Sequence, residues 1–382
     1  MHQAHLNEWK KDFDWPLLLA TVALGVVGVL FIFSATGEGA QAQPWYKQMF
    51  FLQMIWFGAG LGAAAAVCLV DYGKLARWSR VIYWGAIASL AVVLAVGKPI
   101  NGSRRWVTIG GQSLQPSEFA KIAFILVMAE FLSRPEEELR QPRVFFAALG
   151  YTALPCVLIL AEPNIGSALV FGCISLAMLF VAGVPNRFLR RLAGWVGPLV
   201  ALAVAVIIFA PPKLQVAESY QKVVRARLTS YSGLGQSSYN VRQSLISVGS
   251  GGFLGKGWRQ GTQHELGFLP KLGAHNDFIF SVIAEEKGFL GSLTVLSLFG
   301  IVLFNGIRIA GLARDRLGTL FAIGVTVLFT VHVFVNIAMT IGLVPITGIP
   351  LPFISYGGSF VLSCCLLQGL VQSVYRFRKD FP

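Results

Sequence analysis

The sequence is organised as a series of long apolar runs separated by short polar segments. A helix needs about 20 mostly apolar residues to cross the hydrocarbon core of a bilayer. Ten runs approach this length, so we predict ten transmembrane helices, near 16–36, 49–70, 80–97, 117–134, 144–160, 165–183, 192–210, 278–305, 318–344 and 353–375. The expected fold class is an all-α integral membrane protein, with residues 1–382 forming one polytopic membrane domain.

The first run also raises the alternative of a secretory signal peptide, because Ala40-Gln41-Ala42 resembles a cleavage site. The apolar core of such a peptide has about 7–15 residues, and this run is longer. We therefore interpret it as a retained helix.

Composition supports the membrane assignment. Hydrophobic residues make up 55% of the chain and charged residues 13%, about half the charged fraction of a typical soluble domain. The five cysteines fall within the predicted spans and lack the spacing of a metal site. The glycine-rich stretch 249–257 lacks the residue order of a nucleotide-binding phosphate loop, so we expect no ATP-driven chemistry.

The distribution of basic residues predicts the orientation. Ten spans place both termini on one side, and cytoplasmic segments are enriched in Lys and Arg. With the termini inside, the inner segments hold seventeen basic residues and the short outer loops hold four. We therefore expect both termini to be cytoplasmic.

One outer segment, 211–277, is a predicted large extracytoplasmic loop before the eighth span. It carries eight basic residues against three acidic ones, within a chain of formal net charge +13. Two interpretations remain open for this loop: a solvated basic face, or a surface for an anionic partner such as a phosphate-bearing substrate or lipid headgroups.

Asp277 is the strongest candidate for chemistry, because it lies where this loop enters the eighth span beside His275. An aspartate at a helix start can cap the helix. A carboxylate at the membrane boundary can also act as a general base or an ion ligand. Both interpretations stay open on the sequence alone.

A second group of candidates lies between 101 and 121. Glu118 and Lys121 are three residues apart on one face of the fourth span, where they can pair with each other or line a polar pathway. Lys121, Arg104 and Arg105 can hold a phosphate, although Arg105 can also reach the interface beside Trp106.

Three further features are polar or irregular. The segment 345–359, with three prolines and three glycines, predicts a re-entrant or packed connection, or a rigid turn. Glu162-Pro163-Asn164 forms a tight connection between spans five and six. His332 is a lone histidine in span nine, for which we expect a hydrogen bond between helices.

These segments carry a resemblance to the SEDS family of shape, elongation, division and sporulation proteins. The regions 101–121, 162–167, 276–288 and 345–359 resemble the family's signature segments and occur in the same order. The resemblance extends over essentially the whole chain, and 257–263 and 348–353 are most similar to the rod-shape branch, RodA.

The resemblance implies a peptidoglycan glycosyltransferase that polymerises lipid II outside the bacterial cytoplasmic (inner) membrane, working with a class B penicillin-binding protein. It implies that Asp277 is the catalytic residue and that Glu118 and Lys121 are functional. We expect substrate contacts from a set of polar and aromatic residues on the same side of the membrane: Glu118, Lys121, Arg104, Arg105, Trp106, Arg242, His275, Asn276 and Ser355.

The chain departs from the family pattern at several positions. The usual Gln-Pro-Asp is Glu162-Pro163-Asn164 here, so that acid is lost or displaced by two positions, and the usual His-Thr-Asp is His275-Asn276-Asp277. The role of the Glu162 region is therefore open.

Other functions fit the same pattern of spans. A lipid II flippase would also have intramembrane charges, and a scaffold without activity would use the basic loop to bind partners. A divalent cation, Mg²⁺ or Mn²⁺, could bridge Asp277 and a diphosphate, but the sequence has no cluster of metal ligands. The expected partners include membrane lipids and no nucleic acid.

Overall fold

The computed structural model describes residues 12–36, 44–100, 103–109, 112–162, 164–209, 236–269 and 273–379. Each of the ten predicted spans is a helix there, which confirms the all-α class. These helices are α2 (Trp15–Thr36), α3 (Met49–Leu69), α5 (Ser79–Val96), α6 (Pro116–Leu132), α8 (Pro142–Ala161), α9 (Ile165–Val181), α10 (Asn186–Phe209), α14 (Ile279–Leu312), α15 (Arg316–Thr340) and α16 (Gly358–Arg376).

Length and composition make this a multi-pass membrane protein. Among the described residues, seven helices are long and apolar enough to cross a bilayer, and α9 is an apolar helix of 17 residues. Helix α6 also has 17 residues but contains Glu118, Lys121 and Glu130. It is nevertheless among the most buried helices: Glu118 and Lys121 face the protein interior, whereas Glu130 is partly exposed near its C-terminal end.

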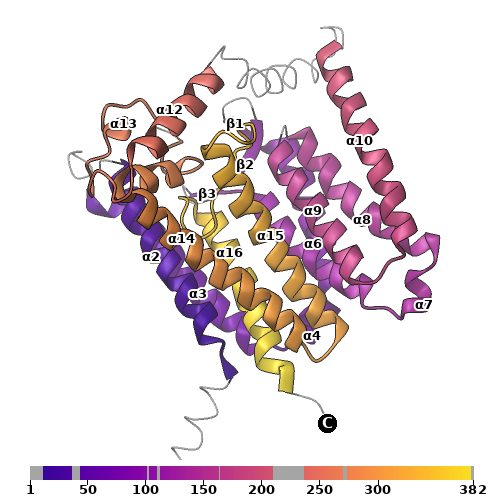
Figure 1. The fold of residues 1–382 in the computed structure, drawn as a ribbon. Coiled ribbons are helices and arrows are strands. Elements are labelled where there is room, and N and C mark those ends of the chain that lie inside the picture. The colour runs from indigo at the N-terminus through magenta and orange to yellow at the C-terminus, as the bar shows by residue number, and fades with distance from the viewer. Residues whose placement is uncertain are drawn as a thin grey trace, which may run out of the picture.

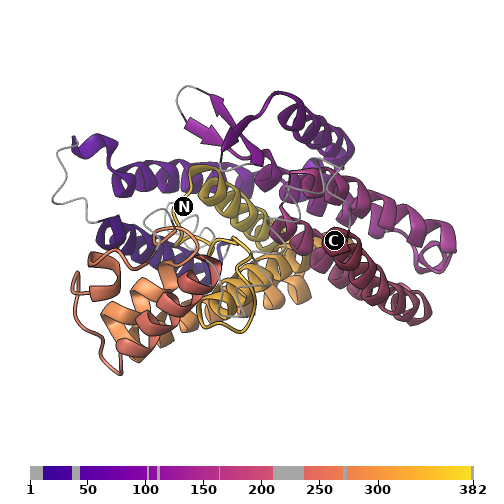
Figure 2. The same ribbon diagram turned by 90° about the horizontal axis from the view of Figure 1, so that it is seen from above.

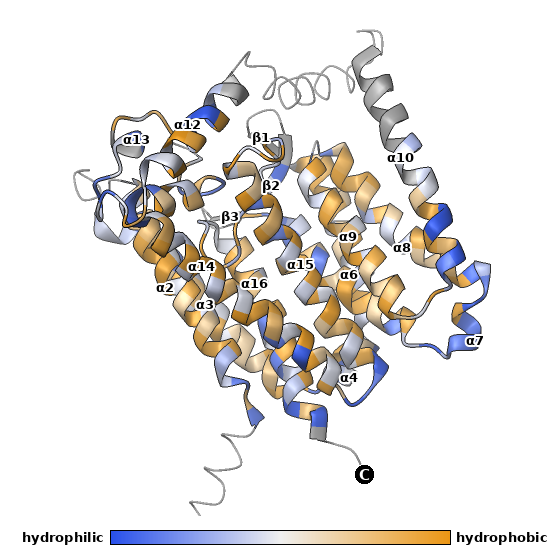
Figure 3. Cartoon of the chain, in the orientation of Figure 1, coloured by the Kyte–Doolittle hydropathy of each residue, from blue (hydrophilic) through white to orange (hydrophobic). Residues whose placement is uncertain are grey.

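The helices lie side by side and the chain has two distinct ends (Figure 1). The start of α2, the end of α16 and the short helices α4 (Tyr72–Arg77) and α7 (Glu136–Leu139) lie at one end, called here the terminal end. Helices α12 (Gln236–Ser250) and α13 (Thr262–Glu265) lie at the other, called the loop end. Hydrophilic residues gather at α7 and α4, and the flanks between the ends are apolar (Figure 3).

The centre of the bundle is formed by α6, α15 and α16. Helix α16 packs along α3, α14 packs against both α2 and α15, and α6 contacts α5, α9, α15 and α16. Helix α10 lies at the periphery, where it contacts α9 (Figures 1 and 2). The centre bears on function because Glu118, Lys121 and Ser355 lie on α6 or on the connection between α15 and α16.

The connection between α5 and α6 contains three short strands that the sequence analysis treated as loop. Strands β1 (Lys98–Ile100), β2 (Ser103–Ile109) and β3 (Gln112–Leu114) form an antiparallel sheet in the order β1-β2-β3, with Val107 opposite Leu114. Two of them have only three residues, too short for an alternating pattern to be recognised. The sheet lies at the loop end (Figure 1).

Helix α14 is interrupted at Gly288, whose φ of 62° and ψ of −155° are not helical. An interruption leaves helical N–H and C=O groups without their usual partners. The glycine-rich stretch 251–257 supplies these partners through four backbone hydrogen bonds: Lys256 N to Glu285 O (3.0 Å), Gly257 N to Glu286 O (3.0 Å), Phe289 N to Gly252 O (2.9 Å) and Leu290 N to Phe253 O (3.2 Å). The stretch is thus a structural clamp on α14.

Glu285 holds the same clamp in place through its side chain. Its buried carboxylate accepts four hydrogen bonds, from Ser247 Oγ (2.9 Å), Lys256 Nζ (2.6 Å), Thr262 Oγ1 (3.2 Å) and Gln263 N (3.0 Å). Glu286 accepts a hydrogen bond from Ser34 Oγ on α2. These carboxylates therefore tie the loop and α2 to α14.

A substitution at Gly255 tests directly whether the stretch 251–257 stabilises α14. Its φ is +84°, and a Cβ at this position would lie 2.2 Å from Glu286 O. We predict that Gly255→Ala lowers the unfolding free energy by about 2 kcal/mol or more, since the left-handed conformation alone costs roughly 1–2 kcal/mol. Thermal unfolding of the detergent-solubilised protein measures the effect.

The matched control is Gly249→Ala, in helix α12, where a Cβ would meet nothing within 4 Å. This change should be neutral or raise stability by about 0.5–1 kcal/mol. Equal unfolding temperatures for the two variants would contradict the clamp.

Candidate active site

Asp277 lies in the turn 273–278 that precedes α14 at the loop end. The N-cap residue of α14 is Phe278, whose side chain makes no capping hydrogen bond. Asp277 is therefore one residue outside the capping position that the sequence analysis considered for it. Its half-buried carboxylate lies against Gly348, since a Cβ on that glycine would be 3.7 Å from Asp277 Oδ2.

The backbone around Asp277 is fixed by three consecutive carbonyl groups. His275 O accepts from Tyr356 N (3.0 Å), Asn276 O accepts from Ser355 Oγ (2.7 Å), and Asp277 O accepts from Asn336 Nδ2 (3.0 Å). The donors come from α15 and from the connection between α15 and α16. Three successive backbone positions are thus held, so the backbone that carries the carboxylate is fixed in place.

The connecting segment 345–357 is irregular, and its residues 349 and 351–355 are buried, as the packed alternative predicted. Buried backbone polar groups must find partners, and here side chains of neighbouring helices supply several of them. The hydrogen bonds are Asn336 Nδ2 to Ile349 O (2.8 Å), His332 Nδ1 with Pro350 O (3.0 Å), Gln53 Nε2 to Ser355 O (3.1 Å) and Gly357 N to Gln53 Oε1 (3.2 Å).

Ser355 is fully buried and uses its hydroxyl on the backbone. Besides donating to Asn276 O, its Oγ accepts from Leu351 N at 2.8 Å. These contacts hold the turn before Asp277 and the segment 351–355 together.

Glu118 and Lys121 form a buried ion pair in the first turns of α6. Lys121 Nζ lies 2.8 Å from Glu118 Oε2, and their side chains are only 2% and 5% exposed. Lys121 Nζ also lies 3.2 Å from His332 Nε2. Because Pro350 O can only accept, His332 Nδ1 carries the proton and Nε2 is left to accept from the ammonium group. A continuous chain of contacts thus joins α6, α15 and the segment 345–357.

Sequence reasoning expected only a helix–helix hydrogen bond from His332 and missed Asn336. Both residues, with Thr340, are buried in α15 and spaced four residues apart. That spacing places them on one face of the helix. Polar residues repeated every four positions in an apolar span were the signal, and they mark the face that holds the connecting segment.

The connection between α8 and α9 lies close to the same segment. A Cβ on Gly166 would lie 2.9 Å from Thr347 O, so the first turn of α9 packs directly on it. Arg105 of β2 donates from Nε to Glu162 O at 3.0 Å. Asn164 Oδ1 accepts from Ser167 N at 3.2 Å and caps α9. Since Asn164 performs the capping, the acidic group at Glu162 is available for another role.

Glu162 is buried, with Oε1 lacking a hydrogen-bond partner among the described residues. Burial raises the pKa of its carboxyl to about 7, although the Arg105 guanidinium opposes the rise. A carboxyl of this kind changes its charge near neutral pH at the loop end of the bundle.

The other predicted residues are distributed around this region. Trp106 is half-buried in β2 opposite Lys98, and Arg242 is exposed on α12. His275 is buried with its ring edge-on to Tyr356, at a centroid distance of 5.7 Å. Asn276 Oδ1 is buried without a partner in the described part of the chain.

Arg104 belongs to β2, but its side chain lies outside the described residues, as do 211–235 and 270–272 of the large loop.

Within the ranges that the structure describes, no three His, Cys, Asp or Glu side chains converge as metal ligands.

The raised pKa of Glu162 predicts a pH dependence of stability. Because the folded-state pKa of about 7 lies above the ordinary value of 4.5, this group stabilises the fold at low pH and that contribution is lost as the pH rises to about 7. We predict that the unfolding temperature of the wild type falls over this interval more than that of Glu162→Gln. Parallel pH profiles of the two proteins would contradict the assignment.

Comparison with known proteins places this arrangement in a family. A family model described as "Cell cycle protein", which covers FtsW, RodA and SpoVE, matches residues 15–380. Stage V sporulation protein E of Bacillus subtilis (strain 168) is 33% identical, over 97% of this chain and 99% of that protein. The peptidoglycan glycosyltransferase MrdB of Escherichia coli (strain K12) is 34% identical, over 97% of this chain and 96% of that protein.

Solved structures agree with the sequence relatives. A chain of a peptidoglycan synthase complex, described as coordinating polymerisation and crosslinking, is 26% identical with a TM-score of 0.79 over 97% of this chain and 99% of that chain. A match from end to end in sequence and in fold leads to one conclusion: the protein belongs to the SEDS family of FtsW, RodA and SpoVE.

Proposed function

We propose that this protein is a peptidoglycan glycosyltransferase that polymerises lipid II into β-1,4 glycan strands, at the outer face of the cytoplasmic membrane. The observation that carries the proposal is the position of Asp277 at the loop end, where three successive carbonyl contacts hold its backbone and its carboxylate lies beside Gly348. The activity named for MrdB supports the reaction class.

In this mechanism Asp277 is the general base. Its carboxylate takes the proton from the 4-hydroxyl of the acceptor sugar as that oxygen attacks C1 of the lipid-linked donor. The bond between C1 and the phosphate oxygen breaks, and the diphosphate leaves with the electron pair. Displacement of an α-linked leaving group inverts C1 and gives the β-1,4 bond. The diphosphate is already an activated leaving group, so the step needs no ATP.

The leaving diphosphate acquires negative charge, which cations at the loop end would stabilise. Arg105 suits this role because β2 and its bond to Glu162 O position it beside the connection that packs on 347–349. Arg104 and Arg242 are further candidates, and Trp106 would pack against a sugar or the lipid. His275 and Asn276 lie in the turn of Asp277 and would contact the acceptor.

Glu118, Lys121 and Ser355 act through other residues in this proposal. All three are buried and already hold partners, so they position the reacting groups. Lys121 supports His332 and thereby the segment that carries Gly348, while Ser355 supports the Asn276 carbonyl.

An apolar groove near these residues favours the proposal of a lipid-linked substrate. It has a volume of about 600 Å³ and lies between α5, α6 and the strands that carry Arg105 and Trp106. Its walls are small or apolar residues, including Gly85, Ala86 and Phe119. A polyprenyl chain would lie in this groove while its diphosphate reaches Arg105.

The partner in this proposal is a class B penicillin-binding protein that supplies the transpeptidase. Support comes from the structural relative, which belongs to a complex described as coordinating polymerisation and crosslinking. The basic residues at the terminal end support a cytoplasmic location of both termini. The segments 257–263 and 348–353 favour the rod-shape branch, with a role in cell elongation.

The test is polymerisation of lipid II by the purified full chain together with its transpeptidase partner. We expect Asp277→Asn to reduce the polymerisation rate by at least about 100-fold, the usual contribution of a general base. The matched control is Glu137→Gln, an exposed carboxylate on α7 at the terminal end, which should retain wild-type activity.

Full activity of Asp277→Asn would contradict the general-base role. Translocation of labelled lipid II in proteoliposomes without any polymer would instead identify a flippase.

A further inference from the structure

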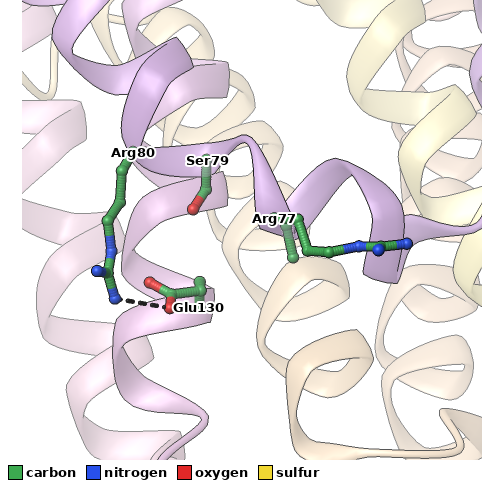
Figure 4. Close-up of a pocket in the computed structure, with 5 residues that line it drawn as sticks. Arg77, Ser79, Arg80 and Glu130 are labelled. Atoms are coloured by element: carbon green, nitrogen blue, oxygen red, sulfur yellow. Dashed lines mark hydrogen bonds and ion pairs between the residues drawn. The ribbon is translucent and has the colours of Figure 1, made fainter.

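A separate polar pocket lies at the terminal end, where α4 leads into α5 beside the last turns of α6 (Figure 4). Its volume is about 350 Å³, and it is lined by Ala76, Arg77, Ser79, Arg80 and Glu130. It lies at the opposite end of the bundle from Asp277 and plays no part in the proposed reaction.

Two buried polar atoms of this pocket lack partners. Ser79 is only 1% exposed, and its Oγ has no hydrogen-bond partner among the described residues; the same holds for Glu130 Oε2. The other carboxylate oxygen of Glu130 is held by Arg80 Nη2 at 3.0 Å. Figure 4 shows Ser79 and Arg80 turned toward Glu130, whereas the Arg77 side chain extends away from them along α4. Such atoms are costly to bury unless a ligand completes them.

The charges around the pocket describe that ligand. Helix α5 begins here directly after α4, with no side-chain cap at Trp78, and the positive end of a helix dipole favours an anion. Arg77 adds a guanidinium group that suits a phosphate. Glu130 Oε2, by contrast, requires an N–H or O–H donor. The ligand should therefore carry an anionic group and a hydrogen-bond donor a few atoms apart.

The surroundings place the pocket at the level of lipid headgroups. Trp78, between Arg77 and Ser79, is 64% exposed, and tryptophan is enriched at the membrane–water interface. One turn further along α5, Val81 and Trp84 are also exposed on an apolar surface. A ligand that enters here comes from the bilayer side.

We propose that this pocket binds the headgroup of a glycerophospholipid from the leaflet at the terminal end. The phosphate lies at Arg77 and the start of α5. The terminal amine or hydroxyl of the headgroup donates a hydrogen bond to Glu130 Oε2 and contacts Ser79 Oγ. Phosphatidylethanolamine and phosphatidylglycerol carry such a donor, whereas phosphatidylcholine does not.

The first experiment compares these lipids on the delipidated full-length protein in detergent. Native mass spectrometry measures the fraction of protein with bound lipid during titration with each of the three. We expect phosphatidylethanolamine and phosphatidylglycerol to bind about threefold to tenfold more tightly than phosphatidylcholine, the effect of one hydrogen bond to a buried group.

Phosphatidylethanolamine and phosphatidylcholine are both zwitterions, so their difference isolates the donor. Equal binding of these two lipids would overturn the proposed hydrogen bond from the headgroup to Glu130 Oε2, even if the anionic phosphatidylglycerol were preferred.

The second experiment uses variants of the pocket. Ser79→Ala and Arg77→Gln should each weaken phosphatidylethanolamine binding by about threefold or more. Ser79→Ala removes a hydroxyl that has no described protein partner, so a loss of lipid binding reports a lost ligand contact. The matched control is Arg140→Gln, also at the terminal end, whose side chain is 71% exposed and which should bind lipid as the wild type does.

Equal weakening in the control would show that headgroups respond only to overall basic charge, and unchanged binding in Ser79→Ala and Arg77→Gln would exclude the pocket. The Asp277→Asn protein should keep wild-type lipid binding, which separates this inference from the proposed catalysis.

Discussion

A buried irregular segment inside a membrane protein must satisfy its backbone polar groups, and this constraint governs the loop end of the bundle. The segment 345–357 has no regular hydrogen bonding along most of its length, so His332, Asn336 and Gln53 supply partners for it from α15 and α3. Asn336 bonds both to this segment and to Asp277 O. The groups that allow the segment to be buried are therefore the same groups that fix the candidate catalytic residue.

This arrangement explains why a buried ion pair lies next to the site without reaching its surface. A buried pair of charges is stable only when its geometry and hydrogen bonds are complete. Lys121 achieves this with Glu118 on its own helix and with His332 on α15. Through His332, which also contacts Pro350 O, the pair supports the connecting segment that packs on Asp277.

Much of the fold could be predicted from the sequence, because ten apolar runs are a strong signal when few charges interrupt them. The pairing of Glu118 with Lys121 was also one of the predicted alternatives, since their three-residue spacing allows it. The strands β1 to β3 could not be predicted, because pairing across a short turn leaves almost no periodic pattern. The clamp on α14 was also missed: Gly251 and Gly255 are required by close contacts with the backbone of Ala284 and Glu286, which lie more than thirty residues away in the chain.

The residues of the candidate site stay a prediction. Asp277 stands out in the sequence because its position at the end of a basic loop is unusual. Ser355 and Lys121 are expected from the sequence to contact substrate, and sequence spacing cannot reveal that both side chains already hold partners within the protein. The importance of Asn336 depends on two carbonyl groups brought together only in the folded chain.

In the proposed reaction, the loop end of the bundle binds a lipid-linked diphosphate sugar against Asp277. The most direct measurement is a structure of the full-length protein in complex with a non-hydrolysable lipid-diphosphate disaccharide and its partner. We predict a sugar hydroxyl within hydrogen-bonding distance of the Asp277 carboxylate and the diphosphate near Arg105. A ligand bound elsewhere, with Asp277 contacting only protein, would contradict the proposed reaction.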